Sequence, residues 1–135
     1  MDDCIFCKII SGEIPCYKIY EDKDVLAFLD IAGDIDGHTL VIPKKHCKNI
    51  LDCEFETLGK VMEVAKVISE HYIKDCGYSG INIMNANEQV SGQSVFHFHV
   101  HIIPRFEGDG ENAFPKFGGA KHSLEIMQNK LKFRG

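Results

Sequence analysis

The alternation of apolar and polar residues along the chain is strictest between residues 96 and 103. Every second position from His97 through His99 to His101 is a histidine, and the positions between them are aromatic or β-branched. A period of two built from these residue types predicts a β-strand whose successive side chains point to opposite faces. We therefore expect the three histidines on one face. The other face is expected to carry Phe96, Phe98, Val100 and Ile102. Pro104 has no N–H to donate, so the pairing of the strand is expected to end there.

Shorter apolar runs predict four further strands. They span residues 17–20, 25–29, 39–42 and 81–84. The polar residues 21–24 are expected to form the turn of a hairpin between the first two. Near the N-terminus, the helical spacing of Phe6, Ile9 and Ile10 predicts a short helix that ends near residue 11. A weaker helical spacing is present over residues 123–133.

One long apolar stripe predicts a single amphipathic helix over residues 54–74. The stripe runs through Phe55, Leu58, Val61, Met62, Ala65, Ile68 and Tyr72 and is widened by Val64 and Val67. Asp52 is a suitable N-cap, and Gly77 lies just beyond the expected end. These elements together predict an α+β fold with a mainly antiparallel five-stranded sheet, one long helix and short N- and C-terminal helices.

Length and composition predict one domain over residues 1–135, with a core at about 4–105 and a C-terminal extension at 106–135. A hydrophobic content of 44% is ordinary for a globular chain. The net charge of −5 disfavours binding to nucleic acid. We expect no membrane span, because no apolar run approaches about 18 residues. The acidic N-terminus lacks the basic start of a signal peptide, which favours a cytoplasmic location. In that compartment the six cysteines are expected to be free or bound to metal.

Three imidazoles on one strand face support two kinds of chemistry besides a plain solvent-facing row. Neutral imidazoles at this spacing can chelate one metal ion. Alternatively, one imidazole attacks an electrophile while its neighbours move protons and hold charge. The preceding residues Gly92, Gln93 and Ser94 favour the second interpretation, because the N–H groups and hydroxyl of such a turn can hold phosphate oxygens.

The string Gly92-Gln-Ser94 followed by His97-Phe-His-Val-His-Ile-Ile103 resembles the signature of the histidine triad family of nucleotide hydrolases and transferases. Segments around Phe6, Ile14, Phe28 and Gly37–Lys44 are also similar to that family. The likeness is greatest to a branch of small homodimers that hydrolyse purine nucleoside phosphoramidates and related adenylates. The resemblance therefore implies the fold of this family, a purine nucleotide substrate and a homodimer.

The same resemblance assigns roles to individual residues. It implies that His99 attacks the α-phosphorus to form a nucleotidyl-histidine, that His101 contacts the phosphate and moves a proton, and that His38 closes the site. The first histidine of the triad, His97, belongs to the same site. The implied nucleotide contacts are Gln93 and Ser94 to phosphate, Asp30 to ribose, and a base pocket of Phe6, Ile9, Ile14, Phe28 and Ile31. Asn85 or Asn87 would also reach the phosphates, since the family's loop asparagine aligns between them, near Ala86.

Alternative activities remain open at this point. His101 stands where the family's transferases carry glutamine, which favours hydrolysis over transfer. The substrate could instead be a dinucleoside polyphosphate, the histidine row could hold a catalytic metal, or the protein could be a nucleotide-binding adaptor.

Cys4-x-x-Cys7 is by itself a weak metal signal, because structural zinc normally has four ligands. Relatives of bacterial type pair such cysteines with two histidines, which here are His46 and His97. The resemblance therefore implies a structural zinc held by Cys4, Cys7, His46 and His97, with no catalytic cofactor. Two reduced cysteines beside a surface histidine would be the ordinary alternative.

Overall fold

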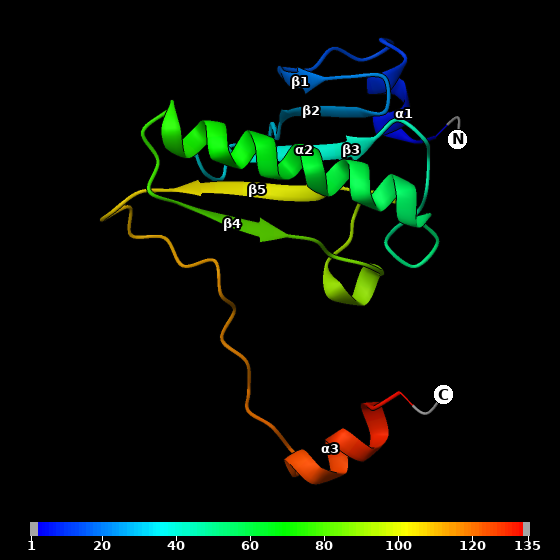
Figure 1. The fold of residues 1–135 in the computed structure, drawn as a ribbon, viewed down its shortest axis with the longest axis vertical. Coiled ribbons are helices and arrows are strands. Elements are labelled where there is room, and N and C mark those ends of the chain that lie inside the picture. Colours follow the sequence, from blue (N-terminus) through cyan, green and yellow to red (C-terminus); the bar gives the residue numbers. More distant parts are fainter. Residues whose placement is uncertain (1–2, 134–135) are drawn as a thin grey trace.

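Five antiparallel strands in the order β1-β2-β3-β5-β4 form the sheet of this protein, and one long helix crosses it (Figure 1). The computed structural model describes residues 3–133. Its elements are α1 (Ile5–Ile10), β1 (Lys18–Glu21), β2 (Val25–Leu29), β3 (Thr39–Pro43), α2 (Phe55–Lys74), β4 (Gly80–Met84), the 3-10 turn η1 (Gln89–Ser91), β5 (Val100–Arg105) and α3 (Leu124–Leu131). The predicted α+β class, sheet and helices are confirmed. The predicted domain bounds, 1–135, include residues at both ends that lie outside the described range.

The α2 side of the sheet holds the larger core. Buried residues from β2, β3 and β5 pack there against the inner face of α2, which consists of Val61, Val64, Ala65, Ile68 and Tyr72. The predicted stripe was too wide, because Phe55, Met62 and Val67 are largely exposed. The predicted N-cap is also wrong: the helix begins after Glu54, whereas the Asp52 carboxylate accepts the N–H groups of Lys48 and Asn49, both at 3.0 Å.

The opposite side of the sheet is covered by α1. A second apolar cluster of Phe6, Leu26, Phe28, Leu40 and Ile42 joins this helix to β2 and β3. The hairpin between β1 and β2 is confirmed, and Asp22 fixes its turn by accepting the N–H groups of Asp24 and Val25 at 2.8 Å. The histidines lie on the same side as α1, beside this smaller cluster.

The strand predicted for the histidine row begins later and ends later than expected, so that it contains only His101 of the three histidines. It begins at Val100, because the N–H of Phe98 donates to the carbonyl of Cys47 at 2.8 Å instead of joining the ladder. It continues through Pro104, which pairs with Ile81 of β4. Pairing with β3 ends at Ile102, so Pro104 has a neighbouring strand on one side only, a position that proline tolerates. Phe96 is not part of the apolar face: it is half-exposed, with the Lys48 ammonium 5.3 Å from its ring centre.

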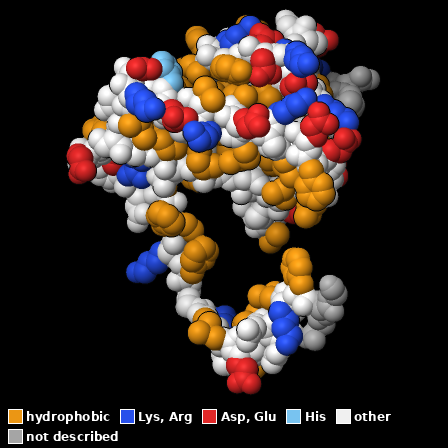
Figure 2. Space-filling model, viewed as in Figure 1, with side chains coloured by type: hydrophobic (Ala, Val, Ile, Leu, Met, Phe, Trp, Pro, Cys, Tyr) orange, Lys and Arg blue, Asp and Glu red, His pale blue; other side chains and the backbone are white. Residues whose placement is uncertain are grey.

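The chain leaves the sheet after Arg105 and runs as an extended segment to α3, which stands apart from the sheet (Figure 1). The predicted C-terminal helix is thus confirmed, but it contributes no buried residue. Apolar side chains gather on the face seen in Figure 2, along α2. None of the helices within residues 3–133 is long and apolar enough to cross a membrane. None of the six cysteines, all of which lie within the described residues, forms a disulfide; the prediction was that they are free or bound to metal.

Candidate active site and metal centre

The three histidines of the row share one side of the sheet, as predicted. The Phe6 ring of α1 lies edge-on to His97 and His99, at centroid distances of 5.8 and 5.2 Å. The rings of His99 and His101 are 4.9 Å apart. Alternation therefore holds even though only His101 lies within the hydrogen-bonded strand.

The main chain fixes the protonation pattern of His99. Its Nδ1 lies 2.8 Å from the carbonyl oxygen of His97, which can only accept, so Nδ1 carries the proton and Nε2 keeps its lone pair. His99 as a whole residue is 6% exposed, and this burial lowers its pKa, which favours the neutral form. The Asn85 amide donates to the carbonyl of His99 itself at 2.9 Å. His99 is thus a neutral, oriented imidazole with one free nitrogen.

His101 belongs to a second imidazole pair with His38, which directly precedes β3. His38 Nε2 and His101 Nδ1 are 2.8 Å apart, and burial lowers the pKa of His101 to about 4. On its other side, His38 Nδ1 lies 2.9 Å from the Asp34 carboxylate, a partner that the sequence analysis missed. The predicted ribose ligand Asp30 is also here, with its carboxylate 3.7 Å from His38 Nε2.

Gly37 positions His38 by bringing the loop close to β5. Its φ is +81°, and a Cβ there would lie 2.7 Å from Pro104 Cγ. Glycine is therefore required both for the backbone conformation and for the close approach.

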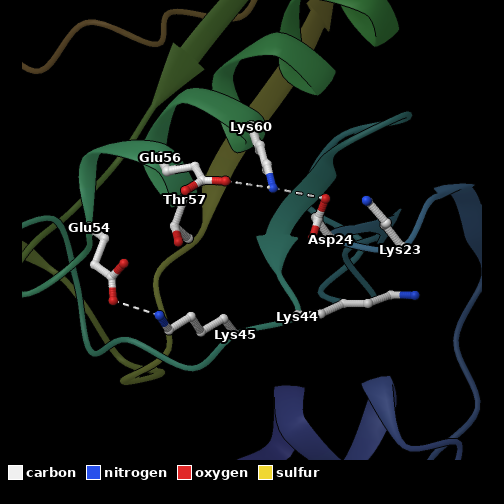
Figure 3. A pocket seen from close by; sticks show the side chains of 8 residues that line it. All are labelled: Lys23, Asp24, Lys44, Lys45, Glu54, Glu56, Thr57 and Lys60. Carbon is white, nitrogen blue, oxygen red and sulfur yellow. Dashed lines mark hydrogen bonds and ion pairs between the residues drawn. The ribbon is translucent and has the colours of Figure 1, made fainter.

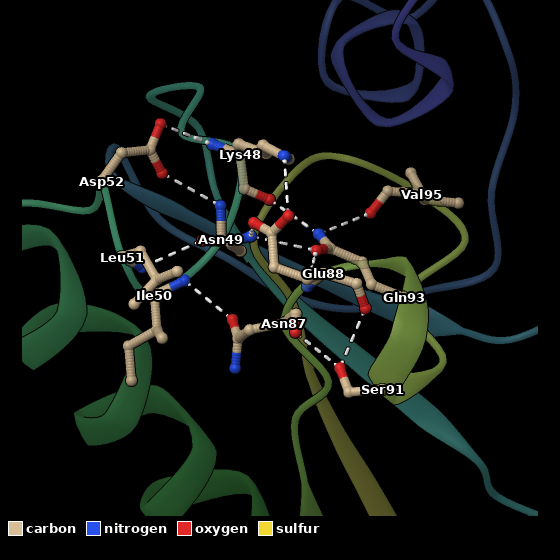
Figure 4. A network of polar contacts seen from close by, with 10 residues as sticks. All are labelled: Lys48, Asn49, Ile50, Leu51, Asp52, Asn87, Glu88, Ser91, Gln93 and Val95. Carbon is tan, nitrogen blue, oxygen red and sulfur yellow. Dashed lines mark hydrogen bonds and ion pairs between the residues drawn. The ribbon is translucent and has the colours of Figure 1, made fainter.

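The turn before the histidines is held by a polar network (Figure 4). Gln93 is buried in it: its Nε2 donates to the carbonyls of Lys48 and Val95 at 2.7 and 3.0 Å, and its Oε1 accepts the Glu88 N–H at 2.9 Å. Both ends of the amide are thus engaged within the protein. Ser94, the next residue, is exposed.

Glu88 and Asn49 complete this network, and sequence analysis gave neither a role. Glu88 has φ 78° and ψ 152°, a conformation that is essentially confined to glycine. Its carboxylate accepts the amide of the buried Asn49 at 2.7 Å and pairs with Lys48 at 3.2 Å. Asn87 accepts the Ile50 N–H at 2.8 Å and donates to Asn85. The one signal in the sequence was the position of Glu88 in the polar loop 85–92 that leads into the histidine row.

The predicted base-pocket residues are only partly brought together. Phe6 and Phe28 are buried against each other in a T-shaped contact of 5.6 Å, with Ile9 beside them. Ile14 is half-buried, whereas Ile31 is 85% exposed in the loop after β2.

The four predicted metal ligands converge beside this site. The two closest pairs that join a cysteine sulfur to a histidine Nδ1, Cys4–His97 and Cys7–His46, are both 3.4 Å apart, and the two Nδ1 atoms are 3.0 Å apart. One tetrahedral zinc ion would place a sulfur and a nitrogen ligand about 3.6 Å apart, given its usual bond lengths. His97 Nε2 lies 2.8 Å from the Pro43 carbonyl, which can only accept, so Nε2 carries the proton and the lone pair of Nδ1 is available to a metal. The donor set therefore fits a closed zinc site.

The three rings of the row point their Nδ1 atoms at different partners. His97 Nδ1 faces the two cysteines, whereas His101 Nδ1 faces His38 and His99 Nδ1 is bonded to the main chain. The arrangement does not aim the three imidazoles at one common ion.

A charged hollow at the start of α2 contains none of the predicted site residues (Figure 3). Ion pairs cross it: Lys60 lies 3.1 Å from Asp24 and 3.2 Å from Glu56, and Lys45 pairs with Glu54. The candidate site therefore lies with the histidines.

Comparisons with known proteins agree with this geometry. The family model of the HIT domain matches residues 11–108, so the chain belongs to the HIT family. A HIT-like protein of Methanocaldococcus jannaschii is 50% identical over 96% of this chain and 98% of its own. The adenosine 5′-monophosphoramidase of Schizosaccharomyces pombe is 40% identical over 76% of this chain and 74% of its own.

Solved structures show the same fold. A HIT family protein from Bacillus anthracis superposes with a TM-score of 0.83 at 45% identity, covering 96% of this chain and 92% of that one. A zinc-bound histidine triad family protein from Mycobacterium smegmatis gives a TM-score of 0.77 at 37% identity, and the match covers 83% of this chain and 81% of that one.

Proposed function

We propose that this protein is a nucleotide hydrolase that cleaves purine nucleoside phosphoramidates or related adenylates through a nucleotidyl-histidine at His99. The main support for this proposal is the contact of His99 Nδ1 with the His97 carbonyl, which leaves a neutral Nε2 free to attack. The phosphoramidase name of the S. pombe relative favours this substrate class over dinucleoside polyphosphates.

The reaction has two displacements. The lone pair of His99 Nε2 forms a bond to the α-phosphorus while the bond from phosphorus to the leaving nitrogen breaks, and the leaving group takes a proton. Water then attacks phosphorus and gives a proton to His101, which replaces the proton taken by the leaving group; the bond to Nε2 breaks, and a nucleoside monophosphate leaves with the lone pair restored to His99. Two moderate barriers replace one high barrier.

The surrounding residues divide into substrate contacts and positioning residues. We assign phosphate contact and proton movement to His101, closure of the site to His38, phosphate contact to Ser94, ribose contact to Asp30, and a base surface to Phe6 and its neighbours. Gln93 and Asn85 act indirectly, because their amides hold the turn and the His99 main chain.

The test replaces the proposed nucleophile. His99→Ala should lower the turnover of adenosine phosphoramidate by at least about 10⁴-fold, because removal of a covalent nucleophile has effects of this size. It should still bind AMP, and the wild-type enzyme quenched in acid should carry AMP on His99 by mass spectrometry. His71→Ala, which alters an exposed histidine of α2, is the matched control. Turnover by His99→Ala at the control rate would rule out the mechanism.

We also propose that Cys4, Cys7, His46 and His97 hold one structural zinc ion, as supported by their convergence and by the zinc-bound M. smegmatis relative. The ion would fix the α1 cysteines to the histidine row. Elemental analysis of protein purified without added metal should find one zinc per chain, and Cys7→Ser should abolish it. Cys76→Ser, an exposed cysteine, should retain it.

A further inference from the structure

A second set of metal-type donors lies in the imidazole pair, away from the two metal-centre cysteines. One carboxylate oxygen of Asp30 and one ring nitrogen each of His38 and His101 all lie within 4.8 Å of one another, and His38 Nε2 is 2.8 Å from His101 Nδ1 and 3.7 Å from the Asp30 carboxylate. Two imidazoles and one carboxylate form the donor set of open zinc sites and of the facial triads that bind other divalent ions. Such a set leaves coordination positions for water or ligand.

The spacing of the two rings already matches that of a metal site. His38 Nε2 and His101 Nδ1 are 2.8 Å apart, and the two nitrogens of the Cys4-Cys7 centre are 3.0 Å apart. Two nitrogen ligands of one zinc ion lie about 3.3 Å apart at ordinary bond lengths. Both pairs therefore need to open by only a few tenths of an ångström.

Asp34 supplies the outer support that metal-binding histidines usually have. Its carboxylate oxygens lie 2.9 and 3.1 Å from His38 Nδ1, which fixes the proton there and points the Nε2 lone pair toward His101. The His101 Nδ1 becomes free when its proton moves to Nε2 of the same ring. The two carboxylates, Asp30 and Asp34, provide the negative charge that a dication requires.

We propose that Asp30, His38 and His101 form a second, three-ligand site for a divalent transition-metal ion such as Zn²⁺. Binding of the ion does not depend on the proposed function. One consequence does rest on that function: the ion would occupy the groups assigned to ribose and phosphate, so it should inhibit turnover in competition with the nucleotide.

The test is a titration of the metal-free, full-length protein with Co²⁺. The wild type should bind two ions. One shows the sulfur-to-cobalt charge-transfer absorption of a thiolate site, and the other shows only ligand-field bands. Cys7→Ser should lose the charge-transfer band and retain the second ion. His38→Ala should retain the band and bind one ion.

Asp34→Asn keeps all three ligands and is the second variant, with the fold of each variant checked by circular dichroism. This substitution should lower the affinity for the second ion about 10–100-fold, the usual effect of losing an outer carboxylate partner. The matched control is His71→Ala, because His71 also has a carboxylate four residues away, Asp75 at 2.8 Å, but is exposed.

Each outcome is decisive. A single ion in the wild type that shows the sulfur-to-cobalt charge-transfer band, or two ions in His38→Ala, would overturn the second site. Loss of the second ion in His71→Ala would place it at the end of α2 and also overturn the proposal. If the second ion binds as expected but phosphoramidate turnover is unchanged, the site stands and the assignment of Asp30 and His101 to the reaction fails.

Discussion

At the scale of single residues, the backbone of Glu88 is held in a conformation that glycine alone adopts easily. Conformations of this kind cost about 1–3 kcal/mol for other residues. The contacts of its carboxylate with Asn49 and Lys48 offset that cost. The strain and the contacts can be separated by two substitutions.

We expect Glu88→Ala to be less stable than Glu88→Gly, although both lose the carboxylate. Alanine keeps the strained backbone, whereas glycine relieves it, so their free energies of unfolding should differ by about 1–3 kcal/mol. Urea denaturation measures this difference, with Gln89→Ala against Gln89→Gly as the control in the adjacent turn. Equal stability of the two Glu88 variants would mean that the loop relaxes without strain.

At the same scale, the side of the sheet on which the histidines lie could be predicted, but the direction of nearby polar side chains could not. The period of two was enough to place His97, His99 and His101 on one side of the sheet. Gln93 stands at an equally suggestive position, yet its amide turns inward to the carbonyl of Lys48, which lies 45 residues earlier. The direction of a turn side chain depends on such distant partners, which a local pattern does not reveal.

At the scale of elements, α2 shows which part of a hydrophobic stripe carries stability. Val61 is 0% exposed and Val67 is 55% exposed, although both fitted the predicted stripe. The stripe correctly predicted that the helix packs on the sheet. The width of the buried face of the helix depends on where the strands beneath it end, and helical spacing does not show this.

These two valines form a matched pair of substitutions. Val61→Ala should lower the free energy of unfolding by about 2 kcal/mol, because it removes two buried methyl groups and leaves a cavity. Val67→Ala should change it by about 0.5 kcal/mol or less. Thermal and urea unfolding measure both, and equal losses would contradict the observed packing of α2.

The short helix α1 contains no more than six residues, so its stability depends on what holds it. Cys4 caps it by accepting the Cys7 N–H at 3.3 Å, and both cysteines belong to the proposed zinc site. An ion at 100 times its dissociation constant would stabilise the folded chain by about 2.7 kcal/mol.

We therefore expect removal of zinc by a chelator to accelerate amide hydrogen exchange in Ile5–Ile10 by at least about tenfold. Exchange in the buried part of α2 should change much less, so it serves as the internal control. Unchanged exchange in α1 after complete removal of zinc would show that apolar packing alone holds this helix.

At the scale of the whole molecule, the sheet ends in an open edge beside an apolar groove. β4 is the last strand of the sheet, and the groove between it and α2 is lined by Met62, Ala65, Ile73, Ile81 and Ile83, with polar residues at its border. An exposed strand edge of this kind is a template for pairing with another chain. Both elements could be predicted from the sequence, but the apolar residues that the sheet leaves uncovered could not. The homodimer was expected from resemblance alone.

We expect two copies of the chain to pair through this face about a two-fold axis, because a self-complementary edge closes into a dimer. Ile83 is 44% exposed at the edge, so Ile83→Lys should place a charge in the interface and shift the protein from dimer to monomer in sedimentation velocity. Phe55→Lys is the control, since Phe55 is 93% exposed at the start of α2, does not line the groove, and should leave the dimer intact. If Phe55→Lys dissociates the dimer and Ile83→Lys does not, the copies meet at the start of α2 instead. In that case the open edge of β4 must be protected from further pairing by other means.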